Sequence, residues 1–286
     1  MQDLTLPSTR TDVAVPMPQG HHLVYFPPQI PPSQLLPDGT DPDHSPGGAF
    51  VRRMWAGGSV RFADGWQEQL RLDGRRALCV ESVGDVNITE GRAPGTEKIF
   101  VDVWRRYGSV GQEADARDIA TVQSSPAIEE KRVLVFMREL VGNDGTTPQV
   151  KEPRIVTFPQ KAEASVTLTP RHSLLFHFSA LTFNAHRIHL DPQYTRDVEG
   201  HPNLLVHGPL SLTLLFAGLR AQLQGSESIK SIEYRNLAPL YAEQPLRICI
   251  AKRQKDAQAD DASRKTWNVW AEGPNGSLAI KGVAST

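Results

Sequence analysis

One segment, PLSLTLLFAGLRAQLQGS at residues 209–226, strongly constrains how this chain can fold. Gly208 can serve as an N-cap, Pro209 suits the first helical position, and Gly225 is a natural stop. The apolar residues surround nearly the whole circumference of such a helix: Leu210, Leu212, Leu214, Leu215, Phe216, Ala217 and Leu219. A helix that is apolar on all sides must be buried. We therefore predict a central helix at about residues 209–224, covered by protein on most sides.

Two series of β-type segments flank this helix. Four precede it, GGSVRF, RALCVESVGDVNI, EKIFVDVWRRYG and KRVLVFMREL, and four follow it, SIKSIEY, LRICIAK, TWNVWAE and SLAIKG. All are rich in β-branched and aromatic residues, and Pro274-Asn275-Gly276 is a strong hairpin signal between the last two. The pattern predicts an α+β fold with two antiparallel sheets, the second wrapped around the helix. A bent sheet around one buried helix is the hot-dog arrangement.

The sequence also predicts how the two halves are divided. The first fifty residues contain ten of the 22 prolines and should be extended and irregular. VGNDGTTPQVKEP then clusters turn residues, so we place a boundary near residue 155. Residues 1–155 would form a degenerate hot-dog domain without an obvious central helix, and residues 156–286 a complete one. A sheet without its helix would leave room for a bulky acyl group.

Composition excludes several classes of function. The net charge of -1 gives no excess of positive charge that would attract nucleic acid. The two cysteines are far apart in the sequence and suggest neither a disulfide framework nor a thiolate metal cluster. No apolar run is long enough for a membrane span. We expect a cytoplasmic protein, or a mitochondrial one if an N-terminal segment is missing, and a homodimer is left open.

The chemistry is concentrated at residues 183–210. Phe183-Asn184-Ala185-His186-Arg187-Ile188-His189 aligns without gaps on the hydratase-2 (MaoC-like) motif Gly-Asp-x-Asn-Pro-Ile-His. Together with RRMWAGG at 52–58 and HGPL at 207–210, it resembles the tandem hot-dog branch of the MaoC-like hydratases and dehydratases, over roughly residues 20–286. The resemblance implies a hydro-lyase acting on acyl thioesters of coenzyme A or of an acyl carrier protein, without a cofactor.

The same resemblance assigns the catalytic residues. His189 aligns with the motif histidine, and an imidazole can both accept and return a proton near neutral pH. Asn184 stands where the motif has a catalytic aspartate; because an amide is no base, His189 would perform both transfers while Asn184 holds water or the thioester. Gly208, at the start of the helix, would donate its N–H to the thioester oxygen. Asn184 could instead make only a turn.

Four further residues are predicted to bind substrate: His186, Arg187, His207 and Trp55. Arg187 could bind the carboxylate of a dicarboxylic acyl group. Trp55 has a plainer interpretation as strand packing. His186-x-x-His189 resembles half a zinc site, but no acidic or cysteine partner stands at ligand spacing, so we assign no metal.

Two other functions are left open by the sequence. Hot-dog folds also support thioesterases and isomerases, and Asn184 weakens the inherited proton chemistry. A non-catalytic module that binds acyl thioesters is the third possibility.

Overall fold

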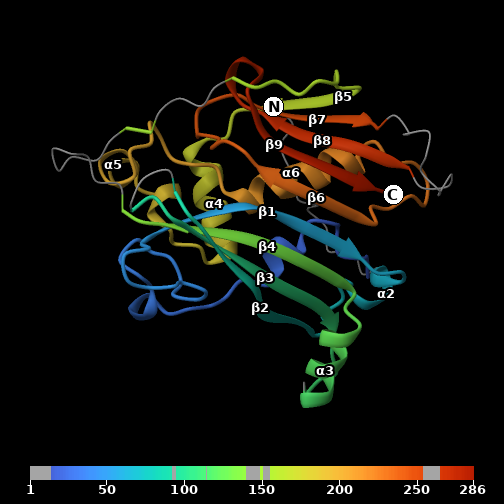
Figure 1. Cartoon of the computed structure of the whole chain (residues 1–286). Coiled ribbons are helices and arrows are strands. Elements are labelled where there is room, and N and C mark those ends of the chain that lie inside the picture. Colours follow the sequence, from blue (N-terminus) through green and yellow to red (C-terminus); the bar gives the residue numbers. More distant parts are fainter. Residues whose placement is uncertain (1–13, 92–94, 114, 140–148, 151–154, 254–264) are drawn as a thin grey trace.

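The computed structural model describes residues 14–91, 95–113, 115–139, 149–150, 155–253 and 265–286. Its nine strands are β1 (Arg52–Phe62), β2 (Ala77–Thr89), β3 (Lys98–Ser109), β4 (Ile128–Met137), β5 (Ala164–Leu168), β6 (Ser231–Asn236), β7 (Leu246–Lys252), β8 (Thr266–Glu272) and β9 (Leu278–Ser285). They lie in the order β2-β3-β4-β1-β6-β9-β8-β7-β5 (Figure 1). Every neighbouring pair is antiparallel.

The strands form one continuous antiparallel sheet, where the sequence predicted two antiparallel sheets in one continuous arrangement. The junction is the pairing of β1 with β6, where Val60 lies opposite Ile232. Both side chains are fully buried. Because β1 also pairs with β4 on its other edge, the strands of the two halves share a single hydrogen-bonded ladder. The predicted segments before and after the helix correspond to β1–β4 and β6–β9.

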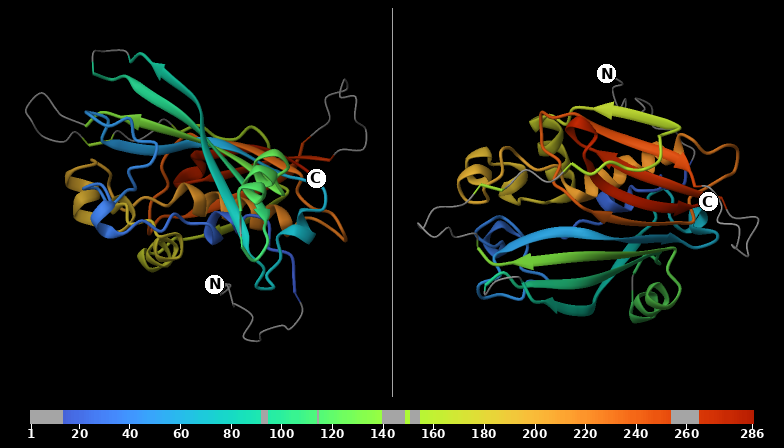
Figure 2. Two further views of the ribbon diagram at one scale, coloured as in Figure 1. Left: turned by 90° about the horizontal axis from the view of Figure 1, so that it is seen from below. Right: turned by 45° about the horizontal axis from the view of Figure 1, so that its top comes forward.

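The long apolar segment forms α6 (Gly208–Arg220), which lies against one face of the sheet (Figures 1 and 2). It begins one residue earlier than predicted, with His207 rather than Gly208 at the N-cap, and it ends before Gly225. Leu212, Leu215, Phe216 and Leu219 are almost completely buried. They belong to a hydrophobic core that also contains first-half strand residues, including Phe62, Tyr107 and Ile128.

The remaining helical elements are short. They are α1 (His22–Tyr25), η1 (Pro32–Gln34), α2 (Trp66–Gln69), α3 (Ala116–Ser124), α4 (His172–Thr182), η2 (Arg187–His189), α5 (Pro192–Asp197) and η3 (Pro274–Gly276). η3 connects β8 to β9, as the hairpin signal predicted. None of the helices that the structure describes is long and apolar enough to cross a membrane.

Residues 172–182, for which the sequence predicted no helix, form α4, and Phe183 is its C-terminal cap. Leu175, Phe178 and Ser179 are its buried residues, at the i, i+3, i+4 spacing of one helix face. β5 was also missed; it is a short edge strand paired with β7. The turn-rich segment used to place the domain boundary lies mostly in residues 140–148 and 151–154, outside the described residues.

Candidate active site

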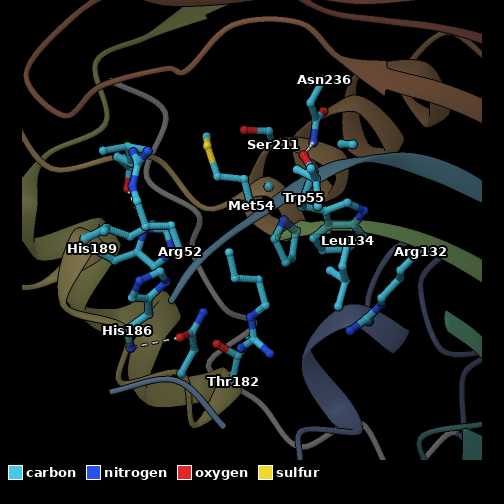
Figure 3. A pocket seen from close by; sticks show the side chains of 18 of the residues that line it. Arg52, Met54, Trp55, Arg132, Leu134, Thr182, His186, His189, Ser211 and Asn236 are labelled. Atoms are coloured by element: carbon cyan, nitrogen blue, oxygen red, sulfur yellow. Dashed lines mark hydrogen bonds between the residues drawn. The ribbon is translucent and has the colours of Figure 1, made fainter. Parts of the chain in front are cut away.

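A cavity of about 800 Å³ lies against β1, β3 and β4. The proline-rich N-terminal segment, the loop after α4 and the start of α6 complete its walls. His186 and His189 lie at one end, Arg132 lies at the other, and Trp55 and Leu134 lie between them (Figure 3). The cavity therefore lies over strands of the first half and is closed by residues of the second half; the predicted room for an acyl group against the first-half sheet stays a prediction.

The loop after α4 is shaped by two local features. Phe183, the C-cap of α4, adopts a left-handed backbone conformation with φ of 50°. The side-chain oxygen of Asn184 then accepts a hydrogen bond of 3.0 Å from the backbone N–H of His186 (Figure 3). This is the turn that asparagine commonly makes two residues ahead of itself. Asn184 lines the cavity, but its carbonyl oxygen is already occupied in the loop.

His189 is held from its Nδ1 side. This nitrogen lies 2.8 Å from the Leu205 carbonyl oxygen, so Nδ1–H donates and Nε2 carries the lone pair. The side chain is 8% exposed and lines the cavity. Burial lowers the pKa of His189 from 6.5 to about 4, while the Leu205 hydrogen bond opposes that shift. A neutral imidazole at pH 7 is the form that accepts a proton.

His186 is the second histidine in the cavity wall. Its ring meets that of His189 edge to face, with centroids 5.7 Å apart. Its Nε2 lies 3.6 Å from a carboxylate oxygen of Asp38, in the N-terminal segment. Burial lowers the pKa of His186 well below its ordinary value, and nearby His189 and Arg53 act in the same direction.

His207 lies behind His189 and is absent from the cavity lining, although we expected it to bind substrate. The two imidazole rings stack with centroids 3.7 Å apart. His207 Nε2 lies 2.8 Å from Ser179 Oγ of α4, and its Nδ1 is buried without a partner. Burial, together with its histidine neighbours, lowers the pKa of His207 well below the ordinary value.

The start of α6 forms the adjoining wall. Gly208 is the first helical residue, so its N–H has no helix carbonyl to bind, and Pro209 has no N–H. Trp55 packs against Gly208 so closely that an added Cβ would lie 3.2 Å from its Cε3 atom. The indole N–H of Trp55 donates to the Gly57 carbonyl oxygen at 2.7 Å. Trp55 thus lines the cavity with its ring face and edge rather than with a free polar group.

Arg187 is not brought together with the other predicted site residues. Its guanidinium pairs with Asp191 at 2.8 Å, lies over the Tyr194 ring, and is outside the cavity lining. The sequence predicted that Arg187 could bind a substrate carboxylate, but at the start of η2 its side chain pairs with Asp191 and does not line the cavity. A contact with a substrate carboxylate would require the guanidinium to leave Asp191, and it stays a prediction.

The arginines that do line the cavity have acidic partners. Arg52 Nε lies 2.6 Å from Glu199, and Arg53 makes two bonds to Asp41. Arg132 binds Glu130 with two nitrogens and lies over the Trp55 ring, 4.9 Å from the ring centre. Because each guanidinium is paired, these residues shape the cavity without giving it a large excess of positive charge.

Comparison with known proteins decides the family. Residues 20–242 match the family model described as hydroxyacyl-thioester dehydratase type 2. The chain belongs to this dehydratase family. A mesaconyl-C(4)-CoA hydratase from Chloroflexus aurantiacus is 32% identical over 96% of this chain and 85% of the relative. A mitochondrial hydroxyacyl-thioester dehydratase type 2 from Schizosaccharomyces pombe is 29% identical over 82% of this chain and 77% of the relative.

Solved structures show the same fold for this member of the dehydratase family. A MaoC-like dehydratase from Phytophthora capsici superimposes with a TM-score of 0.51 and 14% identity. The match covers 85% of this chain and 74% of the other.

The dehydratase-family motifs did not reveal several residues that the fold brings to the site. Asp38 and Ser179 contact the histidines, while Ser211 and Asn236 line the cavity. Asn236 donates to the Trp55 carbonyl oxygen at 2.8 Å, and its own amide oxygen is buried without a partner. Asp38 carries a turn signal in the sequence, PDGT, but nothing there places it beside residue 186.

Proposed function

We propose that this protein is a hydro-lyase that reversibly hydrates an α,β-unsaturated acyl thioester to the 3-hydroxyacyl thioester. The observation that carries the proposal is that His189 and Gly208 line one cavity. The first offers a neutral imidazole nitrogen, and the second offers an N–H at a helix N-terminus. A base and an oxyanion donor facing one space are what this addition requires.

In the forward direction, His189 Nε2 takes a proton from water as the water oxygen bonds to the β-carbon. The electron pair of the carbon–carbon double bond shifts to form a double bond between the α-carbon and the carbonyl carbon, and the carbonyl π pair moves to the thioester oxygen, which gains enolate charge. The Gly208 N–H and the positive end of α6 stabilise that charge. Return of the proton to the α-carbon restores the neutral histidine and completes the hydration. Dehydration follows the same steps in reverse.

The lining supports an acyl group as the substrate portion inside the cavity. Met54, Phe100, Leu134 and Met137 contribute apolar surface along the first-half strands. A dicarboxylic acyl group is the second candidate; Arg132, at the end opposite the histidines, would contact its carboxylate in place of Arg187 while keeping its two bonds to Glu130 (Figure 3). The carrier is coenzyme A or an acyl carrier protein, the two carriers that the sequence indicated.

The fold interpretation and the setting are part of the same proposal. We interpret residues 1–155 as a degenerate hot-dog unit and residues 156–286 as a complete one, with α6 as the central helix of the second. Asn184 contributes by shaping the loop and by offering its amide nitrogen to the cavity. A homodimer and the cytoplasm remain our expectations. Mitochondria are the alternative, since the S. pombe relative is named as mitochondrial.

The test follows the ultraviolet absorbance of a panel of short-chain, medium-chain and dicarboxylic enoyl-CoA substrates. Hydration removes the conjugated absorbance without releasing thiol, and His189→Ala should lower kcat by about 100-fold or more in a folded protein. Release of free thiol would favour a thioesterase. Binding without either change would favour a non-catalytic module, and both outcomes would reject the hydro-lyase.

A further inference from the structure

The proline-rich N-terminal segment is docked directly onto the loop that carries the two cavity histidines. The backbone N–H of Arg187 donates to the Asp38 carbonyl oxygen at 2.8 Å. The next residue, Gly39, has φ of +84°, and an added Cβ would collide with the Ala185 carbonyl oxygen. A glycine is needed there for both the backbone angle and the close approach. The position of Asp38 is therefore set by this contact.

The carboxylate of Asp38 is held in one orientation. Its Oδ1 accepts hydrogen bonds from Thr40 N–H at 2.9 Å and from Thr40 Oγ1 at 2.7 Å. Its Oδ2 faces His186 Nε2 at 3.6 Å, and the two side chains are 12% and 8% exposed. Asp38 is not part of the cavity lining, whereas His186 is. Any effect of this carboxylate on a substrate must therefore pass through His186.

A negative charge beside the histidines would stabilise their protonated form, because both rings are buried. His186 and His189 meet edge to face, and burial favours the neutral form of both. When water gives up its proton, this pair acquires a positive charge in surroundings with little water. The motif aspartate that could offset that charge is absent, since Asn184 is neutral and its oxygen is occupied by the His186 N–H.

We propose that Asp38 is a positioning residue of the active site, which orients His186 and stabilises the positive charge that the His186–His189 pair takes up during proton transfer. The inference rests on the proposed hydro-lyase function. It assigns to the N-terminal segment the negative charge that the loop itself lacks. A carboxylate that holds a histidine and stabilises its cationic form without being protonated is an established arrangement in acid–base catalysis.

The kinetic test compares Asp38→Asn, His186→Ala and the double variant. Asp38→Asn should lower kcat about tenfold or more, with KM within about threefold, because the carboxylate acts on the charged state rather than on binding. In the His186→Ala background it should have little further effect, since its route to the substrate is gone. Asp102→Asn is the matched control: Asp102 is also half-buried and pairs with Lys131 at 3.1 Å, outside the cavity.

Two outcomes would overturn the inference. One is a folded Asp38→Asn protein that retains its kcat within about twofold; the other is a pair of single-variant losses that simply multiply in the double variant. The acid limb of kcat/KM gives a further readout. Loss of the negative charge disfavours imidazolium, so that limb should move to lower pH. An unchanged acid limb in Asp38→Asn would indicate that Asp38 has only a structural role.

A measurement without turnover separates this inference from the proposed function. Nitrogen NMR of the imidazole rings should show a changed tautomer balance at His186 in Asp38→Asn, because a carboxylate and an amide favour different ring protonation. His201, whose Nδ1 lies 3.0 Å from the Tyr241 hydroxyl, is the internal reference. An unchanged His186 would reject the role of Asp38. An inactive wild-type protein with a changed His186 would reject only the hydro-lyase function.

Discussion

The imidazole rings of His189 and His207 lie face to face, with centroids 3.7 Å apart and planes inclined by 22°. His207 is completely buried, and Ser179 of α4 holds its Nε2. The base of the proposed reaction is thus backed by a second ring that lies outside the cavity lining. Since His207 is also the N-cap of α6, the same residue fixes the histidine and the start of the helix that carries Gly208.

We predict that His207→Ala lowers kcat about tenfold or more by loosening the His189 ring. Removing the ring also admits water behind His189, which should raise its pKa from about 4 toward 6.5. More of the base is then protonated in mild acid. The ratio of kcat/KM at about pH 6 to that at about pH 8 should fall below the wild-type ratio. Ser179→Ala should give a smaller change in the same direction, and an unchanged ratio in both would contradict the stacking role.

A second prediction concerns acid stability and uses His22, far from the catalytic loop in sequence. Its ring is completely buried among Phe62, Tyr107 and Phe216, and both ring nitrogens lack hydrogen-bond partners. Burial lowers the pKa of His22 to about 4, against the opposing charge of Glu130. Between about pH 6.5 and about pH 4, the His22 side chain is therefore protonated in the unfolded chain but neutral in the folded chain. Its stabilising contribution is present above about pH 6.5 and is lost as pH falls toward 4.

The measurement is the free energy of unfolding in urea at about pH 7 and about pH 5. Each histidine of this kind contributes a slope of about 1.4 kcal/mol per pH unit in that window. His22→Phe keeps an aromatic ring in the cluster and removes one titrating group. The variant should lose less stability than the wild type between the two conditions. An equal loss would show that His22 titrates normally in the folded protein.

The third prediction tests the start of α6. Gly208→Ala keeps the backbone N–H but places a Cβ 3.2 Å from Trp55 Cε3. The indole must shift by a few tenths of an ångström, and the methyl group narrows the space beside the proposed oxyanion donor. We expect kcat/KM to fall about tenfold or more while the thermal midpoint stays near that of the wild type. A folded variant with normal kcat/KM would place the thioester away from this helix end.

The fourth prediction contrasts two arginines. Arg187→Ala should leave kcat/KM within about twofold, because its side chain is 45% exposed and paired with Asp191 outside the cavity. Arg52→Ala should instead lower the free energy of unfolding by about 3–5 kcal/mol, because the buried carboxylate of Glu199 would lose its positively charged partner. Urea unfolding and steady-state rates on the same preparations measure both. A large loss of activity in Arg187→Ala would return that residue to the substrate site.

Local sequence pattern predicted every described strand except β5, together with the long apolar helix α6. The β-type segments before and after the helix coincide with β1–β4 and β6–β9, because strands that are buried on one face select β-branched and aromatic residues that can be recognised in the sequence. Local pattern failed at α4, where Leu175, Phe178 and Ser179 are buried with helical spacing inside an apolar run that also resembles a strand. The number of sheets was equally undetermined, since the β1–β6 pairing joins residues about 170 positions apart.

The sequence by itself determined the family, the apolar helix and the residue types of the catalytic loop, because motifs and periodicity are properties of neighbouring residues. Tertiary structure alone decided which side chains share the cavity. It turned Arg187 outward, placed His207 behind His189 and brought Asp38 from a proline-rich segment to His186. The physical reason is that long-range packing and backbone hydrogen bonds, such as Arg187 N–H to the Asp38 carbonyl oxygen, set these distances, and no local pattern encodes them.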